Sequence, residues 1–172
     1  DHPQVVWRCP QLPPSPTAAW QLIQTQTAAW PAQHMVVIGS SLGGFYARAL
    51  SLQRGCRAAL LNPAVFPSRD LARYIGEQTG WHDPNERFFF EPGYVQELQV
   101  LQALIDQQAL LHPNRPEQLY ALITEGDEVL SWEEMAAACE GGSVRLLPGG
   151  DHAISDFPLH LDGLLHYLNL VR

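Results

Sequence analysis

The chain has 172 residues, of which 46% are hydrophobic and 16% charged, and this composition fits one globular domain with a sizeable core. The formal net charge of −8 disfavours binding to nucleic acid or to an anionic membrane surface, because neither attracts an acidic protein. All ten basic residues are arginine, which excludes a lysine Schiff base, and no apolar run is long enough to span a membrane.

Short apolar runs alternate with helical patterns along the chain. In chain order we expect a strand at 5–9, a helix at 17–30, a strand at 34–39, a helix at 42–54, strands at 57–63 and 119–125, a helix at 132–139, a strand at 143–148 and a helix at 158–171. Strands separated by helices form parallel sheets that are covered on both faces. The pattern therefore predicts a single α/β domain over residues 1–172.

Residues 64–118 interrupt this alternation. They contain no convincing strand, only a short helix near 69–75, a polar and aromatic loop at 80–93 and a helix at 94–111. An insertion of this length often forms a lid over a site. The alternative is a plain crossover that an extra helix has made longer.

The cysteines carry no metal-site or disulfide pattern. Cys9, Cys56 and Cys139 are widely spaced, odd in number and form no CxxC pair. We expect reduced thiols, and, because no signal peptide is visible, a cytoplasmic protein.

The stretch VVIGSSLGG (36–44) joins a predicted strand to a predicted helix and contains the pattern G-x-S-x-G. Small residues two positions before and after the central serine avoid a collision between strand and helix. Gly39 and Gly43 fulfil this around Ser41, whereas Ile38 and Leu42 would flank Ser40. Ser41 is therefore the candidate nucleophile, and the N–H of Leu42 the candidate oxyanion donor at the start of the helix. The alternatives are a turn that only packs tightly, or one that holds a phosphate.

A serine nucleophile needs a base, and the base needs a third group that orients it. On this architecture the order should be serine, acid and histidine, each after a later strand. The loop after 119–125 offers Asp127, with Glu125 and Glu128 as competitors. We prefer Asp127 because it follows the strand and Gly126; a solvated acidic loop is the alternative.

The loop after the last strand, PGGDH, supplies His152 as the candidate base. Asp151 is its chain neighbour and is poorly placed to orient the ring, so we expect it to serve the loop. The other histidines are less well placed: His2, His34, His82, His112, His160 and His166. His160 and His166 form no persuasive metal pair, and we expect no metal or other cofactor.

Several blocks together resemble a known family: PQLPPSP (10–16), VVIGSSLGGFYA (36–47), LLNPAVFP (60–67), ITEGDEVLSW (123–132) and GGDHAISDF (149–157). The chain resembles, over almost its whole length, the YqiA-like esterases, small bacterial members of the α/β-hydrolase fold. The resemblance implies hydrolysis of a small-molecule carboxylic ester or acyl thioester, with Ser41 as nucleophile, Asp127 as acid, His152 as base and no cofactor. An acyltransferase or peptidase on the same fold is an alternative, as is a non-catalytic binding protein of this fold.

The chain departs from the family at its start. The family opens with a strand that ends in a His-Gly-Phe turn and whose backbone supplies the second oxyanion donor; this first family strand has no counterpart here. By the resemblance it would lie between the strands at 5–9 and 34–39, and its absence would leave backbone groups unpaired. We expect the natural protein to carry a further N-terminal segment. Substrate and oligomeric state are not readable from the sequence.

Overall fold

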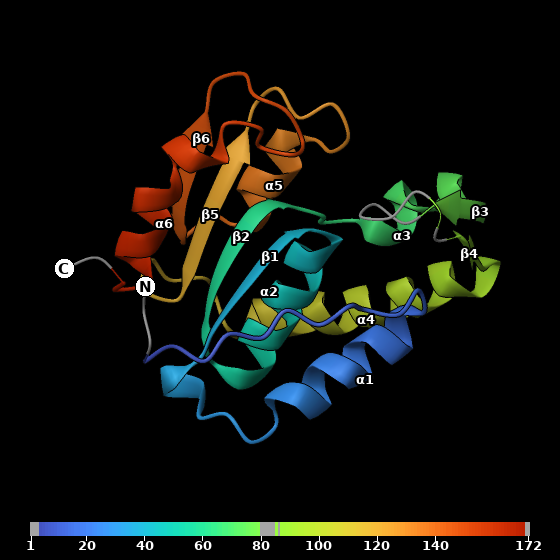
Figure 1. The fold of residues 1–172 in the computed structure, drawn as a ribbon, viewed down its shortest axis with the longest axis horizontal. Coiled ribbons are helices and arrows are strands. Elements are labelled where there is room, and N and C mark those ends of the chain that lie inside the picture. The colour runs from blue at the N-terminus through green and yellow to red at the C-terminus, as the bar shows by residue number, and fades with distance from the viewer. Residues whose placement is uncertain (1–3, 80–84, 86, 171–172) are drawn as a thin grey trace.

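A computed structural model describes residues 4–79, 85 and 87–170 (Figure 1). The elements in chain order are α1 (Pro16–Thr27), the 3-10 turn η1 (Ala32–His34), β1 (Val36–Ser41), α2 (Leu42–Arg54), β2 (Arg57–Pro63), α3 (Pro67–Asp70), η2 (Ala72–Tyr74), β3 (Gly76–Thr79), β4 (Arg87–Phe90), α4 (Pro92–Leu111), β5 (Leu119–Thr124), α5 (Trp132–Ala138), β6 (Ser143–Leu147), η3 (Phe157–Leu159) and α6 (Leu161–Tyr167).

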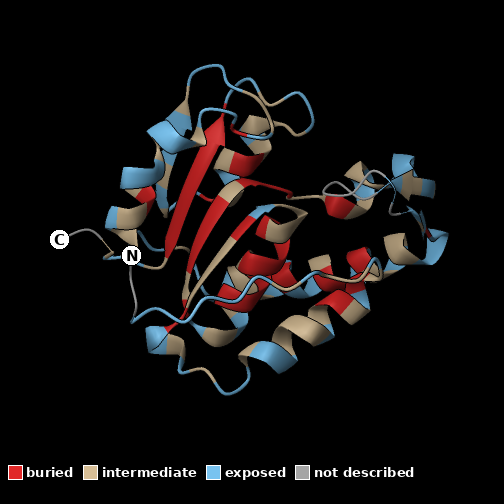
Figure 2. Cartoon of the chain, in the orientation of Figure 1, coloured by how far each residue is buried: buried red, intermediate tan, exposed pale blue. Residues whose placement is uncertain are grey.

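The main sheet has four strands in the order β1-β2-β5-β6, and all neighbouring pairs are parallel. Every residue of β5 is buried, as expected for an apolar strand covered on both faces (Figure 2). The predicted parallel sheet is therefore confirmed. Because the strands are parallel, the loops that follow them meet at one edge of the sheet.

Helices cover both faces of this sheet, as predicted. Ala58 and Leu60 of β2 pack in one cluster with residues of α2 and α5. Ala59, between them, packs on the opposite face in a cluster that includes Leu164 of α6. This alternation follows from the two-residue period of a strand. A separate cluster joins α1, α2 and α4 beside the sheet.

The insertion at 64–118 differs from the prediction in one respect: it contains strands. β3 pairs with β4 in an antiparallel hairpin, with Gly76 opposite Phe90. The expectation of no strand was wrong because GEQT has no apolar signature and is extended only through its partner RFFF. The helix expected near 69–75 is shorter, α3 followed by η2. Residues 80–84 and 86 of the predicted loop, with His82, lie outside the described residues.

The last predicted helix is also shorter than expected. It begins as η3 and continues as α6, which ends at Tyr167. Asn169 adopts a positive φ of 57°, a left-handed conformation that does not continue an α-helix.

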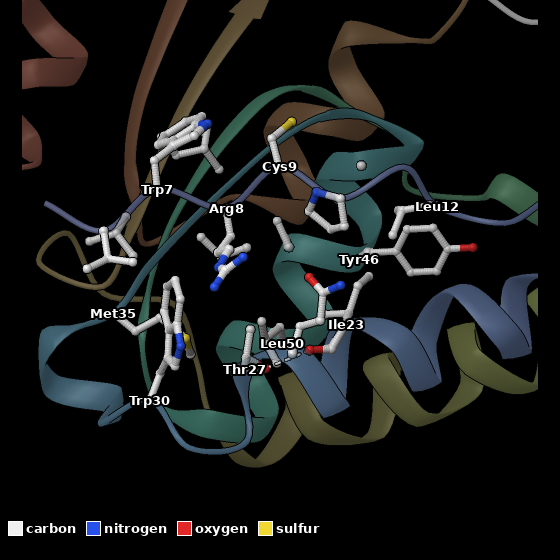
Figure 3. A pocket seen from close by; sticks show the side chains of 18 residues that line it. Trp7, Arg8, Cys9, Leu12, Ile23, Thr27, Trp30, Met35, Tyr46 and Leu50 are labelled. Carbon is white, nitrogen blue, oxygen red and sulfur yellow. Dashed lines mark hydrogen bonds between the residues drawn. The ribbon is translucent and has the colours of Figure 1, made fainter.

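The expected strand at 5–9 was wrong. Within the described part of the chain, residues 5–9 make no backbone hydrogen bond, and Val6 and Trp7 are 71% and 68% exposed. A strand needs a partner, and an apolar cavity of about 250 Å³ separates this segment from β1. Figure 3 shows Trp7, Arg8 and Cys9 on one side of the cavity and Met35, Trp30 and Leu50 on the other. β1 thus has no strand beside its outer edge among the described residues.

Candidate active site

Ser41 lies where β1 ends and α2 begins, on the turn that G-x-S-x-G predicts. Its backbone has φ 52° and ψ −122°, a combination that residues with a side chain rarely adopt. Its carbonyl oxygen accepts a hydrogen bond from the Ala64 N–H at 2.9 Å. Strain of this kind persists only where neighbouring contacts hold it, and it gathers at functional sites. Leu42 follows as the first residue of α2.

Two glycines at this turn are needed for close packing, and a third is not. A Cβ on Gly39 would overlap the carbonyl oxygen of Gly43, so strand and helix could not approach as they do. A Cβ on Gly44 would lie 2.7 Å from the Cβ of Pro63. A Cβ on Gly43 would meet nothing within 4 Å, because Gly43 lines the cavity beside β1. The expected need for a small residue is confirmed at Gly39 and wrong at Gly43.

Asp127 lies in the loop after β5, and its side chain has 0% exposure. Oδ1 accepts hydrogen bonds from the backbone N–H groups of Val129 and Leu130, both at 2.8 Å. Oδ2 lies 2.7 Å from Nδ1 of His152. The backbone of its own loop thus fixes the carboxylate in the orientation that faces the imidazole.

The loops after β5 and β6 are held together along their backbones. The N–H of Gly126 donates to the carbonyl oxygen of Gly149 at 2.8 Å. A Cβ on Gly126 would lie 2.5 Å from the carbonyl oxygen of Gly150, so only glycine permits this approach. Gly149 and Gly150 have φ of 71° and 80°, a region that favours glycine. The PGGDH sequence therefore turns sharply and brings His152 next to the acid loop.

His152 joins the three predicted residues into one row. Its Nε2 lies 2.9 Å from the Ser41 hydroxyl oxygen, and its Nδ1 faces Asp127. The imidazole side chain is 18% exposed. With the Nδ1 proton donated to the carboxylate, Nε2 is the acceptor for the serine hydroxyl. The row comes from the ends of β1, β5 and β6, which meet because the strands are parallel.

The competing acids occupy other positions. Glu125 is exposed. Glu128 contacts the backbone of His152, since its Oε2 accepts the His152 N–H at 3.0 Å. Asp151 serves its loop, as expected: Oδ1 accepts the Ser155 N–H at 2.9 Å, and the hydrogen bonds from Ser155 lower the pKa of Asp151.

The remaining described histidines lie away from this row. His160 Nε2 contacts Asp156 Oδ2 at 3.1 Å, within a local turn. Among the described residues no group of three or more His, Cys, Asp or Glu side chains could hold a metal ion. The cysteines are free thiols, and burial raises the pKa of both Cys56 and Cys139 to about 11. No helix of the described chain has the length and apolarity that a membrane span requires.

Two buried polar residues beside the row escaped prediction, Asn62 at the end of β2 and Thr124 at the end of β5. Asn62 donates to the backbone carbonyls of Asp151 and His152. The available signal was Asn62 itself, a single polar residue near the end of the otherwise apolar run AALLNP.

Comparison with protein-family models assigns the chain to a family. Residues 1–169 match the model of Uncharacterised protein family (UPF0227), the family of YqiA-like proteins. The chain belongs to this family. The resemblance found in the sequence is therefore confirmed, and the family match extends over nearly the whole chain.

Solved structures identify the fold of this family member. The monoacylglycerol lipase of Paleococcus ferrophilus superposes with a TM-score of 0.60 at 12% identity, over 91% of this chain and 76% of that chain. The esterase domain from a Rhodothermus marinus protein gives 0.54 at 18% identity, over 87% and 66%. A point mutant of a haloalkane dehalogenase from Agrobacterium tumefaciens C58 gives 0.56 at 10% identity, over 93% and 75%. The chain has the α/β-hydrolase fold.

Proposed function

We propose that this protein is a serine hydrolase that cleaves carboxylic esters or acyl thioesters through an acyl-enzyme intermediate. The observation that carries the proposal is the hydrogen-bonded row Ser41–His152–Asp127, with 2.9 Å between hydroxyl and imidazole and 2.7 Å between imidazole and carboxylate. A serine hydroxyl is a weak nucleophile at neutral pH, and an imidazole in this position can take its proton. The names of the structural neighbours, an esterase domain and a lipase among them, agree with ester chemistry.

The reaction follows from the protonation states of the row. Ser41 Oγ attacks the acyl carbonyl carbon while His152 Nε2 takes the hydroxyl proton, and the carboxylate of Asp127 stabilises the imidazolium. The imidazolium then gives this proton to the leaving alcohol or thiol, and an ester bond to Ser41 remains. Water attacks that ester with His152 again as base, which releases the acid and restores the hydroxyl.

The negative charge on the carbonyl oxygen needs donors. The Leu42 N–H, at the first position of the 13-residue helix α2, is one proposed donor, and the helix N-terminus favours negative charge there. The second proposed donor is a backbone N–H on the outer side of β1, where no strand pairs with β1 among the described residues.

The insertion at 64–118 is proposed to act as a lid. Arg69 of α3 makes two hydrogen bonds to the Glu134 carboxylate of α5, at 2.8 and 2.7 Å. This ion pair joins the insertion to the part of the domain that carries the acid loop. Its opening would free α3 from α5, whereas α4 of the insertion stays packed against α1 and α2.

The test uses p-nitrophenyl acetate, butyrate and octanoate with the wild type and the Ser41→Ala variant. We expect hydrolysis by the wild type, an initial burst of one p-nitrophenol per protein, and a loss of activity in Ser41→Ala of about 10⁶-fold. A fluorophosphonate probe should label the wild type at Ser41 and leave the variant unlabelled. Hydrolysis that Ser41→Ala leaves unchanged would remove Ser41 from its role. No turnover of any ester or thioester by the natural full-length protein would favour a binding protein.

A further inference from the structure

Asn62 is a buried polar residue that the proposed reaction does not use. It has 0% exposure and a φ of 40°, in the left-handed region that asparagine tolerates better than most residues. The pairing of β1 with β2 shifts at this point: Ser40 lies opposite Leu61, whereas Ser41 lies opposite Pro63. Asn62 is thus the extra residue of a β-bulge, a device that re-aims a side chain and is frequent next to active sites.

The side-chain amide of Asn62 joins three elements. Nδ2 donates to Thr124 Oγ1 at 2.9 Å and to the carbonyl oxygens of Asp151 and His152, both at 3.1 Å. Oδ1 accepts the backbone N–H of Thr124 at 2.9 Å. The Thr124 hydroxyl in turn donates to the Asp151 carbonyl at 3.0 Å. An amide with both ends bonded has a single orientation, so it holds the loop after β6 against the ends of β2 and β5.

This amide reaches the backbone of His152 rather than its ring. The His152 N–H is bonded to Glu128 and its carbonyl to Asn62, so the backbone is held on both sides of the Cα atom. The two residues before this loop segment, Gly149 and Gly150, have no side chains that could hold it. The backbone at residues 151–152 is therefore held by Asn62 and Thr124 on one side, by Glu128 on the other, and by the Ile154 N–H, which donates to the Asp151 carbonyl at 3.1 Å.

The same short segment also holds the nucleophile. The Ala64 N–H donates to the Ser41 carbonyl, and Pro63 packs against Gly44 at the start of α2. Asn62, Pro63 and Ala64 form one rigid connection between the serine turn and the histidine loop.

We propose that Asn62 is a positioning residue for the reaction: it sets the distance between His152 Nε2 and Ser41 Oγ by holding the His152 backbone. The proposal rests on the proposed hydrolase function. Displacement of a reacting group by about 1 Å can cost about 10²-fold in rate. The effect belongs in kcat, because the Asn62 amide lies behind the row, bonded to Thr124 and to the backbone of the histidine loop.

The primary variant is Asn62→Gly, which suits the positive φ and removes the amide. We expect kcat for p-nitrophenyl butyrate to fall about 10²-fold, with KM changed less than about threefold. Thr124→Val, which keeps the shape and removes the hydroxyl, should lower kcat about tenfold, and Thr124→Ser should restore most of it.

Asn114→Ala is the matched control. The Asn114 amide also ties backbone carbonyls, those of Ala138 and Glu140, both at 3.0 Å, at a place remote from the row. It should lower the unfolding midpoint and leave kcat within twofold. If Asn62→Gly keeps a native circular dichroism spectrum and its kcat stays within twofold of wild type, the proposal is overturned. If Asn62→Gly does not fold, the variants Thr124→Val and Thr124→Ser decide. A wild-type kcat in Thr124→Val then overturns the proposal.

A readout independent of turnover separates this proposal from the hydrolase function. In the NMR spectrum of the wild type we expect the His152 Nδ1 proton at low field, as its bond to Asp127 requires. Asn62→Gly should shift or broaden this signal, and Asn114→Ala should not. An unchanged signal in folded Asn62→Gly contradicts positioning by Asn62. An altered signal in a protein without esterase activity keeps the positioning and rejects the reaction.

Discussion

The two borders of the main sheet, one toward β5 and β6 and one beyond β1, differ in the contacts that hold the chain there. Toward β5 and β6, the loops that follow the strands are joined by backbone bonds, by a buried amide and by glycines that permit contact. On the outer side of β1, residues 5–9 lie across an apolar cavity and make no backbone hydrogen bond within the described chain. The residues proposed to transfer protons depend on the first side. The second proposed oxyanion donor depends on the second side.

The contacts therefore fix the positions of Asp127 and His152 most firmly, at the place where the proposed reaction moves a proton. Hydrogen bonds of 2.7 and 2.9 Å tolerate little displacement, and each partner of His152 has its own support. The following variants contrast the two sides, beyond the large loss expected for Ser41→Ala.

The largest remaining effect is expected for Asp127→Asn. An amide keeps an oxygen for the N–H groups of Val129 and Leu130, so the loop should fold, but its NH₂ group cannot accept the Nδ1 proton of His152. We expect kcat to fall about 10⁴-fold. The control is Glu128→Gln, which should cost less than tenfold because the side-chain oxygen of glutamine can still accept the His152 N–H. Equal losses in steady-state kinetics would contradict the assignment of Asp127.

Gly39→Ala tests the turn between β1 and α2. The added Cβ would overlap the backbone of Gly43, so we expect the free energy of unfolding to fall by about 2–3 kcal/mol, with loss of activity. Gly43→Ala is the matched control, since its Cβ meets open space, and should change stability by less than about 0.5 kcal/mol. Urea denaturation of both variants measures the contrast. A similar loss in Gly43→Ala would mean that the cavity beside β1 is filled.

The contrast in packing is tested by Leu60→Ala and Trp7→Ala. Leu60 is completely buried in β2, and its truncation should cost about 2–5 kcal/mol of unfolding free energy. Trp7 is mostly exposed beside the cavity, and its truncation should cost less than about 0.5 kcal/mol. A large cost for Trp7→Ala would show that residues 5–9 are held by contacts that the described chain lacks.

A smaller effect than that of Leu60→Ala is expected at Glu97, which anchors the start of α1 near the outer side of β1. Its Oε2 accepts the Ser15 hydroxyl and the Thr17 N–H, both at 2.8 Å. Partial burial opposes ionisation, but these hydrogen bonds outweigh it and lower the pKa of Glu97 below its ordinary value of 4.5. Glu97→Gln should therefore lower the free energy of unfolding at pH 7 by less than about 1 kcal/mol, because solvent screens a partly exposed charge.

The pH dependence of this effect has a definite sign. Because the pKa of Glu97 is lower in the folded state, its stabilisation is present above pH 4.5 and is lost as the pH falls through the folded value. The stability difference between wild type and Glu97→Gln should shrink as the pH falls below 4.5 and through the lowered pKa of Glu97. Glu91→Gln on the same helix makes a control, since Glu91 makes no side-chain cap bond. A difference that stays constant with pH would contradict the role of the carboxylate charge.

The sequence predicts the strands that have apolar runs and the site residues that follow them. The candidate residues Ser41, Asp127 and His152 could be predicted because each lies at the end of a strand or in the loop that follows it, and parallel strands end at one edge. Residues 5–9 resemble a strand but lack a partner, and pairing is a property of the whole fold. β3 shows the opposite: its four residues are polar and do not resemble a strand, but they form one by pairing with β4.

The role of Asn62 was not readable for a related reason. Its side chain reaches the loop after β6 from a point where the register of β1 against β2 shifts by one residue. A bulge is a relation between two strands, and neither strand's sequence announces it. The need for glycine at 126 was not readable either, because it arises from the close approach of Gly126 to Gly150 in another loop.

The order of strands in space, β1-β2-β5-β6, is also their order along the chain. During synthesis the sheet can therefore grow from one border to the other, each new strand adding to a surface that already exists. Its last strand ends at Leu147, and His152 emerges only after it. A nascent polypeptide thus carries Ser41 for more than a hundred residues without the imidazole that we propose activates it, so the proposed reactivity would arise only when translation of the domain is nearly complete.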